Sequence, residues 1–304
     1  MAWSLPGLPD GRRLADLCRE AGARENIEPE LVEKDFHLTR VVAALAQRLG
    51  GDLLLKGGTL LSKVDLGFFR MSEDADFVIP GEPSRIGRAN AARIEPVRAA
   101  LVALAPELGA TIRFPGGTRY EHNAHLVWML DYASDLGQQA IKVEVSIRPV
   151  LRASRIVPLR QLLHDPLIGD YSGAECHALS ADEARAEKVR AAFTREEGRD
   201  FYDLDQLMDA GTDLSSAAFV ELVDRKLAEL GYAPVGLQGP NFGLDDRRRR
   251  SLASSIRADL PAVLRANVPP FDLDIMLHRF DGLWPSDRSR QGQRMLPGRG
   301  RGRG

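Results

Sequence analysis

The chain has few cysteines and no long apolar segment. Its 304 residues include two cysteines, Cys18 and Cys176, and neither lies in a CxxC pair or a Cys/His zinc spacing. This excludes a disulfide framework and a cysteine-ligated zinc, and it is typical of free thiols in a cytoplasmic protein. No apolar run approaches the ~20 residues that span a bilayer, and residues 1–8 lack the pattern of a signal peptide. We therefore expect a cytoplasmic protein without membrane association.

An excess of charge of one sign is also absent. The formal net charge is −2 and the pI is about 6.3, so any binding to nucleic acid requires a local basic patch. Two segments qualify, namely the arginines at 247–250 on a predicted helix and the RGRGRG sequence that ends the chain. For the arginine run, a solvated helix face paired with Asp245 and Asp246 is an equally good interpretation.

The order of predicted elements indicates an α+β fold. Apolar residues recur at helical spacing near the N-terminus and after residue 180, whereas alternating and short apolar runs between them predict strands. Residues 149–173 are expected to connect these halves. We predict four parts: N-terminal helices at 1–50, a core with a mixed sheet at 51–175, a helical C-terminal domain at 176–284, and a disordered tail at 285–304.

A glycine turn lies near the start of the predicted core. The apolar run at 53–55 predicts a buried strand, and Gly57 and Gly58 separate it from a helical pattern that begins at Thr59. Backbone N–H groups at such a turn, at the start of a helix, can bind phosphate oxygens. The turn is therefore a candidate binding site for a triphosphate.

Carboxylates follow the turn at a spacing that suits a metal. Asp74 and Asp76 are two residues apart on a predicted strand, which places both on one face. Glu144 lies on the polar face of a later strand and completes an all-oxygen site, typical of Mg²⁺ rather than Zn²⁺, if that strand is adjacent. Two such ions could activate the attacking oxygen and stabilise the leaving one. Carboxylate pairs on surface strands are also common, and Glu144 could face solvent.

Four sequence blocks carry a family resemblance that covers about residues 28–265. The blocks are VEKDFHLTRVVAAL (32–45), KGGTLLSKV with FFRMSEDADF (56–77), IKVEVS (141–146) and ARAEKVRAAFTREEGRDFYDLDQL (184–207). Together they resemble the AbiEii/AbiGii-type nucleotidyltransferase toxins, the enzymatic halves of bacterial toxin–antitoxin pairs, which include mycobacterial toxins.

The resemblance implies a fold, a reaction and a partner. The fold would be a polymerase-β-like nucleotidyltransferase core with a helical second domain. The reaction would transfer nucleotides from an NTP, with Mg²⁺, to the 3′ end of tRNA, which would block aminoacylation and translation. The partner would be an antitoxin, of winged-helix type and encoded upstream. An AMPylation-type transfer to a protein side chain and a catalytically idle binding protein remain as alternatives.

The resemblance also implies residue roles. Asp203 would orient Lys188 or an arginine, and Lys188 would contact the phosphates. The catalytic set would be Ser72, Asp74, Lys188 and Asp203; the nucleotide-binding set Gly57, Gly58, Thr59, Arg70 and Lys188; and the metal set Asp74, Asp76 and Glu144.

Several charged residues have a structural interpretation instead. Glu33, Lys34 and Asp35 interrupt the apolar face of the second helix, which favours a solvated face. Without the family resemblance, Lys188 would be interpreted as an ordinary surface lysine. Arg199 and Asp200 could simply form an ion pair at a helix start.

Four further residues near the predicted site remain open. Lys56 and Lys63, near the turn, could contact phosphate or lie at the surface. His122 and His125 are interpreted as non-catalytic, because no carboxylate lies at a useful spacing. Phosphorylation of Ser72 by a partner would add ~−1.5 to −2 charges beside Asp74 and oppose triphosphate binding.

Overall fold

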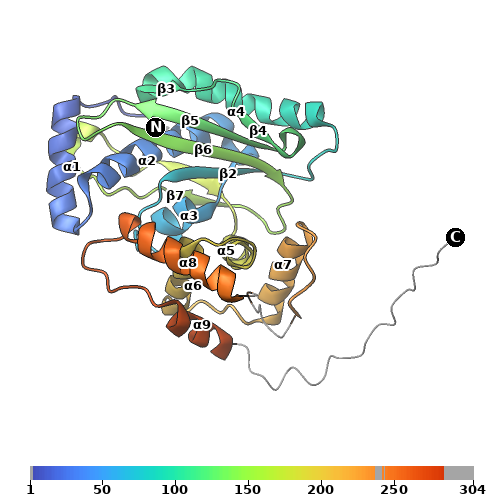
Figure 1. The fold of residues 1–304 in the computed structure, drawn as a ribbon. Helices are drawn as coiled ribbons and strands as arrows, with labels where there is room; N and C mark the ends of the chain where they lie inside the picture. The colour runs from blue at the N-terminus through green and yellow to red at the C-terminus, as the bar shows by residue number, and fades with distance from the viewer. Residues whose placement is uncertain (1–2, 237–241, 243, 284–304) are drawn as a thin grey trace, which may run out of the picture.

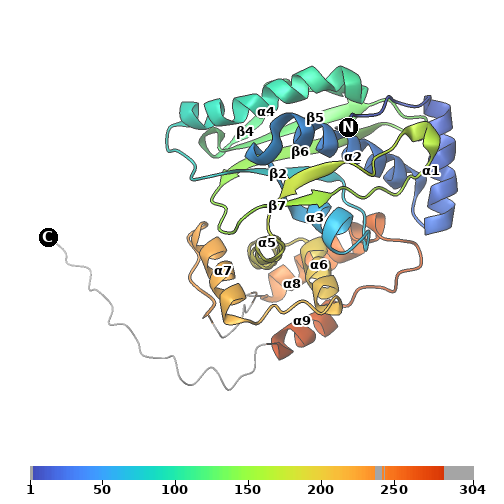
Figure 2. The ribbon, with the colours of Figure 1, turned by 180° about the vertical axis from the view of Figure 1, so that it is seen from behind.

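One mixed sheet forms the centre of the molecule. The computed structural model describes residues 3–236, 242 and 244–283, so the tail predicted at 285–304 lies outside the described residues. Figures 1 and 2 show α4 at one end of the molecule and α5 to α9 grouped at the opposite end, with the sheet between them. The predicted α+β class is confirmed.

The sheet brings together strands that are far apart in the sequence. Its strand order is β3-β5-β6-β2-β1-β8-β7, with β4 paired to β5. The β2–β6 and β1–β8 pairs are parallel and the other pairs are antiparallel. The strands are β1 (Leu54–Leu55), β2 (Asp74–Pro80), β3 (Ala110–Ile112), β4 (Thr118–Tyr120), β5 (His125–Tyr132), β6 (Gln139–Arg148), β7 (Arg155–Pro158) and β8 (Glu175–Ala178).

Local sequence signals mark the first turns of two helices. Pro29 occupies the first turn of α2, where its missing N–H has no helical partner to lose. The Ser180 hydroxyl accepts a hydrogen bond from the Glu183 N–H at the start of α5. The helices are α1 (Gly11–Glu25), α2 (Pro29–Leu49), α3 (Gly57–Leu60), α4 (Gly87–Leu108), α5 (Ala181–Thr194), α6 (Gly198–Asp209), α7 (Ala217–Ala228), α8 (Asp246–Ala258) and α9 (Leu273–Gly282).

One prediction of connecting chain is wrong. Residues 149–173 contain β7, which pairs antiparallel with β8, and β8 in turn extends the sheet beyond β1. Both strands have only four residues, which is too short for alternation to distinguish a strand from a loop. The two strands are defined by their pairing in the complete fold, which the local sequence does not predict.

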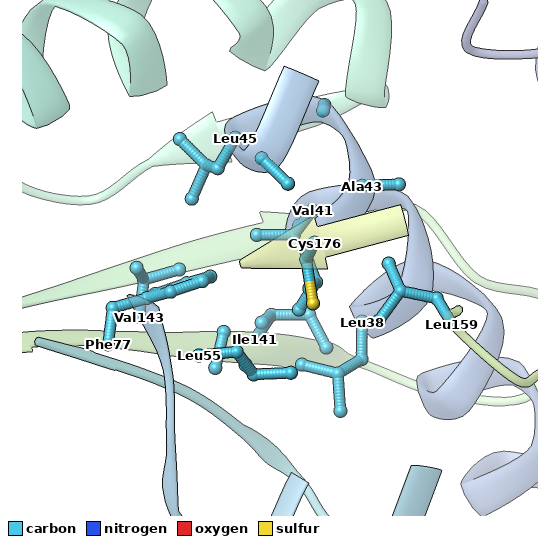
Figure 3. Close-up of a cluster of buried hydrophobic side chains, with 14 of the residues drawn as sticks. Leu38, Val41, Ala43, Leu45, Leu55, Phe77, Ile141, Val143, Leu159 and Cys176 are labelled. Atoms are coloured by element: carbon cyan, nitrogen blue, oxygen red, sulfur yellow. The ribbon is translucent and has the colours of Figure 1, made fainter. Parts of the chain in front are cut away.

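The main core lies between α2 and one face of the sheet. Figure 3 shows Leu38 and Val41 of α2 in one apolar cluster with Phe77 of β2 and Val143 of β6. Inward-facing residues of β5 and β6 alternate with half-buried ones on the opposite face. Because each buried aliphatic or aromatic side chain contributes about 1.5–3 kcal/mol, this apolar face fixes the register of the strands. The polar face is thereby turned toward α5 and α6.

The charged residues of α2 correct a second prediction. Glu33 and Asp35 are buried, with exposed fractions of 0% and 2%, so the expected solvated face is wrong for both. Asp35 accepts a hydrogen bond from Lys63, whose Nζ also bonds the Thr39 hydroxyl at 2.7 Å. Burial lowers the pKa of Lys63, whereas the Asp35 carboxylate opposes that shift. This buried pair fastens α2 to the π-helical turn at 61–65 that continues α3.

Candidate active site

The two predicted aspartates lie at the start of β2, on its polar face. In the parallel register with β6, Asp74 is paired with Lys142 and Asp76 with Glu144. Neighbouring strands are about 4.8 Å apart, so all four polar side chains occupy one small area of the sheet. The condition for including Glu144, that its strand be adjacent to β2, is therefore met.

The glycine turn packs directly against these carboxylates. Gly57 has φ +73°, and a Cβ at this position would lie 2.3 Å from Asp76 Oδ2. Gly57 therefore needs to be glycine both for its backbone conformation and for space. A Cβ on Gly58 would lie 2.6 Å from Arg70 Nη2. The turn is thus enclosed between Asp76 on one side and Arg70 on the other.

Lys188 reaches the site from α5 as part of a buried ionic cluster. Its Nζ lies 2.8 Å from Asp200 Oδ1 and 2.6 Å from Asp203 Oδ2. Asp203 also accepts two hydrogen bonds from Arg70, at 2.6 and 2.8 Å. Burial favours the neutral amine, but Asp200 and Asp203 together raise the pKa of Lys188, so it is held as a cation. Asp203 orients both Lys188 and Arg70, and the surface-lysine interpretation of Lys188 is wrong.

Four predicted residues support the glycine turn and Lys188 from behind. The guanidinium of Arg70 is engaged by Asp203 and by the Met71 carbonyl. The Thr59 hydroxyl donates to Ser72 Oγ at 2.8 Å beneath the turn. Asp203 has an exposed fraction of 0%. In this structure Thr59, Arg70, Ser72 and Asp203 hold the turn and Lys188 in position.

A second ionic cluster lies on the sheet, and it was not predicted from the sequence. Lys142 Nζ lies 3.0 Å from Asp74 Oδ2 and 2.9 Å from Glu144 Oε2. His125 Nε2 of β5 lies 3.0 Å from Glu144 Oε1, so the fold does bring a carboxylate to His125, although their spacing in the sequence did not indicate it. That His125 is non-catalytic stays a prediction. The contact joins residues 19 positions apart through strand pairing. The only local signal was the polar side of β6, where Lys142 precedes Glu144 by two positions.

Six of the predicted site residues line one small cavity, together with further cations. Its volume is about 110 Å³, and Gly57, Gly58, Asp74, Asp76, Glu144 and Lys188 line it. Lys56 and Arg195 also line it, and neither forms an ion pair with another described residue. Free cations beside carboxylates suit a polyphosphate that brings its own negative charge.

A larger cavity adjoins the first on the side of β5. Its volume is about 420 Å³, and it shares Lys56, Glu144, Glu187, Arg190 and Arg195 with the smaller cavity. His125 and Arg148 line it on the sheet side, and Tyr232 follows α7 on the other. The two cavities together exceed the ~300 Å³ at which ligand sites begin, whereas the smaller one alone has room only for phosphates.

The oxygen donors of the two aspartates fit Mg²⁺, whereas those of Glu144 are already engaged. Burial raises the pKa of Asp74, and Lys142 partly offsets this by favouring the carboxylate. Oxygen donors from Asp74 and Asp76 on one face fit a hard cation. Both oxygens of Glu144 are engaged, by His125 and Lys142, and the described residues hold no ready cluster of three His, Cys, Asp or Glu ligands. The two aspartates therefore fit the ion, whereas Glu144 as a third ligand stays a prediction.

The arginine run is largely occupied by structural contacts. Arg247 pairs with Glu196 at 3.1 Å and Arg249 with Asp274 at 2.6 Å. Arg248 donates to the carbonyl of Arg195 at 3.0 Å and to two other carbonyls. These contacts favour a paired helix face for most of the run, but the ion-pair partners are Glu196 and Asp274, so the predicted pairing with Asp245 and Asp246 is wrong.

Comparison with known proteins agrees with the geometry. The family model described as nucleotidyl transferase AbiEii toxin, type IV toxin–antitoxin system, matches residues 40–283. The chain belongs to this family. It is therefore a nucleotidyltransferase toxin of a type IV toxin–antitoxin system, and membership implies an antitoxin partner. The family resemblance predicted from the four sequence blocks is confirmed.

Solved structures confirm the predicted fold. MenT4, a nucleotidyltransferase toxin from Mycobacterium tuberculosis H37Rv, is similar with a TM-score of 0.58 and 21% identity, over 91% of this chain and 92% of that one. JHP933 from Helicobacter pylori has a TM-score of 0.51 and 15% identity, over 87% and 96% of the two chains. No curated protein matches the sequence. Among the described residues, no helix is both long and apolar enough to cross a membrane.

Proposed function

We propose that this toxin transfers nucleotides from an NTP to the 3′ end of tRNA, with Mg²⁺ held at Asp74 and Asp76. The observation that carries the proposal is the single cavity that joins the Gly57–Gly58 turn, the two aspartates and Lys188. Nucleotidyl transfer needs phosphate-binding N–H groups, metal-binding carboxylates and a cation at the phosphates, and this cavity brings the three together. An altered 3′ end could not be aminoacylated, so translation would stop.

Each side chain has a distinct part in this proposal. The N–H groups of the turn bind phosphate oxygens, and Lys188 neutralises charge that develops as pyrophosphate leaves. Asp203 and Arg70 position Lys188 and the turn. When bound, Mg²⁺ supplies electrostatic stabilisation of the attacking and leaving oxygens. Lys56 and Arg195 offer further positive charge where the smaller cavity opens into the larger one.

The acceptor is expected to approach through the larger cavity. Its lining combines the sheet-side residues His125 and Arg148 with Tyr232 near α7. Cations and an aromatic ring suit the phosphates and the unstacked bases of a single-stranded RNA end. The net charge of the chain is slightly negative, so a local surface of this kind is what RNA binding requires.

Incubation with tRNA, Mg²⁺ and each of the four labelled NTPs tests the proposal. The native chain should transfer label to the tRNA 3′ end, and Asp74→Asn should lower the rate at least ~10²-fold, because a metal-binding carboxylate is worth several kcal/mol in the transition state. Asp131→Asn is the matched control, since Asp131 lies on the same sheet but pairs with Arg113 outside the cavity.

The same assay separates the alternatives. Label on protein instead of RNA would replace the proposal with AMPylation-type transfer. No label from any NTP, or equal label from the native and Asp74→Asn chains, would refute transfer at this site. EDTA should abolish incorporation, and added Mg²⁺ should restore it.

The antitoxin partner is proposed to be a winged-helix-type protein encoded upstream. Silencing through a phosphate on Ser72 is one route, because Ser72 lies beneath the turn and beside the phosphate-binding N–H groups. Mass spectrometry of the toxin co-expressed with that neighbour tests it. A silenced toxin with unmodified Ser72 would exclude this route.

A further inference from the structure

One member of the arginine run in α8 points into the protein. The side chain of Arg248 is 18% exposed, against 47% for its neighbour Arg249. Its guanidinium donates to the carbonyls of Phe193 at 3.2 Å, of Arg195 at 3.0 Å and of Phe242. A guanidinium can satisfy several carbonyls at once, because its N–H donors are fixed in one plane. Arg248 therefore serves the fold of this region and is not presented to a surface ligand.

Two of these carbonyls lie at the C-terminal end of α5, the helix that carries Lys188. The last carbonyls of a helix lack intrahelical partners and carry partial negative charge, so a cation beside them is favourable. Arg195 caps α5, and its N–H donates to the Ala191 carbonyl at 2.8 Å. The backbone of Arg195 is therefore held on both sides, by α5 at the N–H and by Arg248 at the carbonyl.

The same helix α8 also holds the segment that follows Arg195. The Gly198 N–H donates to the Ser255 hydroxyl at 3.1 Å. A Cβ on Gly198 would lie 2.7 Å from Ile256 Cγ1 and 3.0 Å from the Ile256 backbone nitrogen, so this close approach of the two backbones requires glycine. Arg248 and Ser255 thus fasten the connection between α5 and α6 at both of its ends.

The side chain of Arg195, in contrast to its backbone, is free. It is exposed and forms no ion pair with another described residue, and Arg195 lines both active-site cavities. Lys188 and Ala191 line the smaller cavity from the same face of α5, because residues three, four and seven positions apart share a helix face. A cation at 195 therefore lies on the same side of α5 as Lys188.

The carboxylates around the cavities do not occupy this cation. Those in the two linings are Asp74, Asp76, Glu121, Glu144, Glu187 and Glu229. Each except Asp76 forms an ion pair with a different cation, and Asp76 belongs to the proposed metal pair. Arg195 is therefore left for an anion that enters the cavity from outside.

We propose that Arg248 is a positioning residue of the active site, which fixes the backbone of Arg195 so that the Arg195 guanidinium binds the phosphates of the NTP. The inference rests on the proposed function, because it assigns Arg195 to the triphosphate that the glycine turn and Lys188 also bind. A segment that is already held in place loses less conformational freedom when a ligand binds, and its affinity is higher for that reason. Without Arg248, the ligand itself would have to order residues 195–198.

Equilibrium binding to the full chain tests the proposal, with Mg²⁺ present and RNA absent so that no transfer to RNA occurs. The probes are inorganic tripolyphosphate and each of the four NTPs. Arg195→Met should weaken binding about 10-fold, because charge-assisted hydrogen bonds to phosphate are lost. Arg248→Met should weaken it about 3- to 10-fold, and Arg248→Lys should weaken it less. Arg249→Met is the matched control and should bind normally, since Arg249 pairs with Asp274 on the same helix and lines neither cavity.

A double variant separates positioning from a general effect on the fold. If Arg248 acts through Arg195, Arg248→Met should change the affinity of the Arg195→Met chain by less than about 2-fold. An equal loss in the native and the Arg195→Met backgrounds would overturn the proposal. Thermal unfolding shows which variants are folded, and Arg248→Lys, which keeps the cation and the apolar stem, supplies the same comparison if Arg248→Met does not fold.

The native chain and Arg195→Met distinguish failure of this inference from failure of the proposed function. A native chain that binds none of the probes would refute the triphosphate site itself. Native binding that Arg195→Met leaves unchanged, or that a folded Arg248→Met chain retains in full, would refute only the positioning of Arg195 by Arg248.

Discussion

Two ionic clusters lie at the candidate active site, and they differ in burial. The cluster of Arg70, Lys188, Asp200 and Asp203 comes from three segments and is almost wholly buried, with Asp203 at 0% exposure. The cluster of Asp74, Lys142, Glu144 and His125 lies on the sheet, with side chains 23–35% exposed. The buried cluster holds the site in shape, and of its four residues only Lys188 lines the smaller cavity. The ion pairs within the open cluster are exposed enough for a bound ligand to replace them.

The difference in burial sets the expected energetics. Breaking a buried pair leaves an uncompensated charge and costs about 3–5 kcal/mol, whereas exposed pairs contribute about 0–1 kcal/mol. The buried cluster should therefore dominate stability. The open cluster should affect ligand binding far more than it affects folding.

The largest expected effect is that of Asp203→Asn. It leaves Arg70 and Lys188 without their shared carboxylate, so the free energy of unfolding should fall by about 3–5 kcal/mol. Urea unfolding measures it. Asp205→Asn on the same helix, whose partner Arg279 is partly exposed, should cost under ~1 kcal/mol. Equal losses in both variants would contradict the distinction between the clusters.

The glycine turn between the clusters should give the next largest effect. Gly57→Ala adds both a strained φ and a collision with Asp76, whereas Gly50→Ala adds only the strained φ, because nothing lies within 4 Å of its Cβ. Gly50→Ala should cost about 1–2 kcal/mol, and Gly57→Ala should cost clearly more and lose nucleotide affinity. Calorimetric unfolding and NTP titration check this. A Gly57 variant that behaves like the Gly50 variant would show that the turn can move away from Asp76.

The pH dependence of stability should reveal the same cluster with a smaller effect. Burial opposes ionisation of Asp203, but Arg70 and Lys188 lower its pKa below the unfolded value of about 3.9. Its contribution is therefore present above pH ~4 and is lost as pH falls through the folded pKa. Urea midpoints between pH 6 and 3 should fall more steeply for the native chain than for Asp203→Asn. Parallel curves would show that another carboxylate controls acid unfolding.

The smallest expected effect on stability is that of Lys142→Met. Lys142 is 34% exposed on its side chain, so the free energy of unfolding should change by only about 0–1 kcal/mol, with further screening by salt. Urea unfolding in low and high salt measures it. A loss near that of Asp203→Asn would show that the open cluster also holds the fold together.

Part of the site could be predicted from local sequence. Gly57, Gly58, Asp74 and Asp76 lie within twenty residues of one another, and their chemistry follows from a turn and the two-residue period of a strand. His125 could not be predicted, because its contact with Glu144 arises from antiparallel pairing of β5 and β6. The burial of Asp35 could not be predicted either, because its partner Lys63 is 28 positions away in the sequence.

The sequence by itself determined the α+β class, the positions of most helices, the glycine turn and the two aspartates, because these depend on periodicity and on short spacings. Only the tertiary structure decided which charges are interior. Strand order placed Lys142 and Glu144 beside the aspartates, and packing of α5 against α6 buried Lys188 with Asp203. A charge is costly to bury without a partner, so its role depends on neighbours that only the complete fold provides.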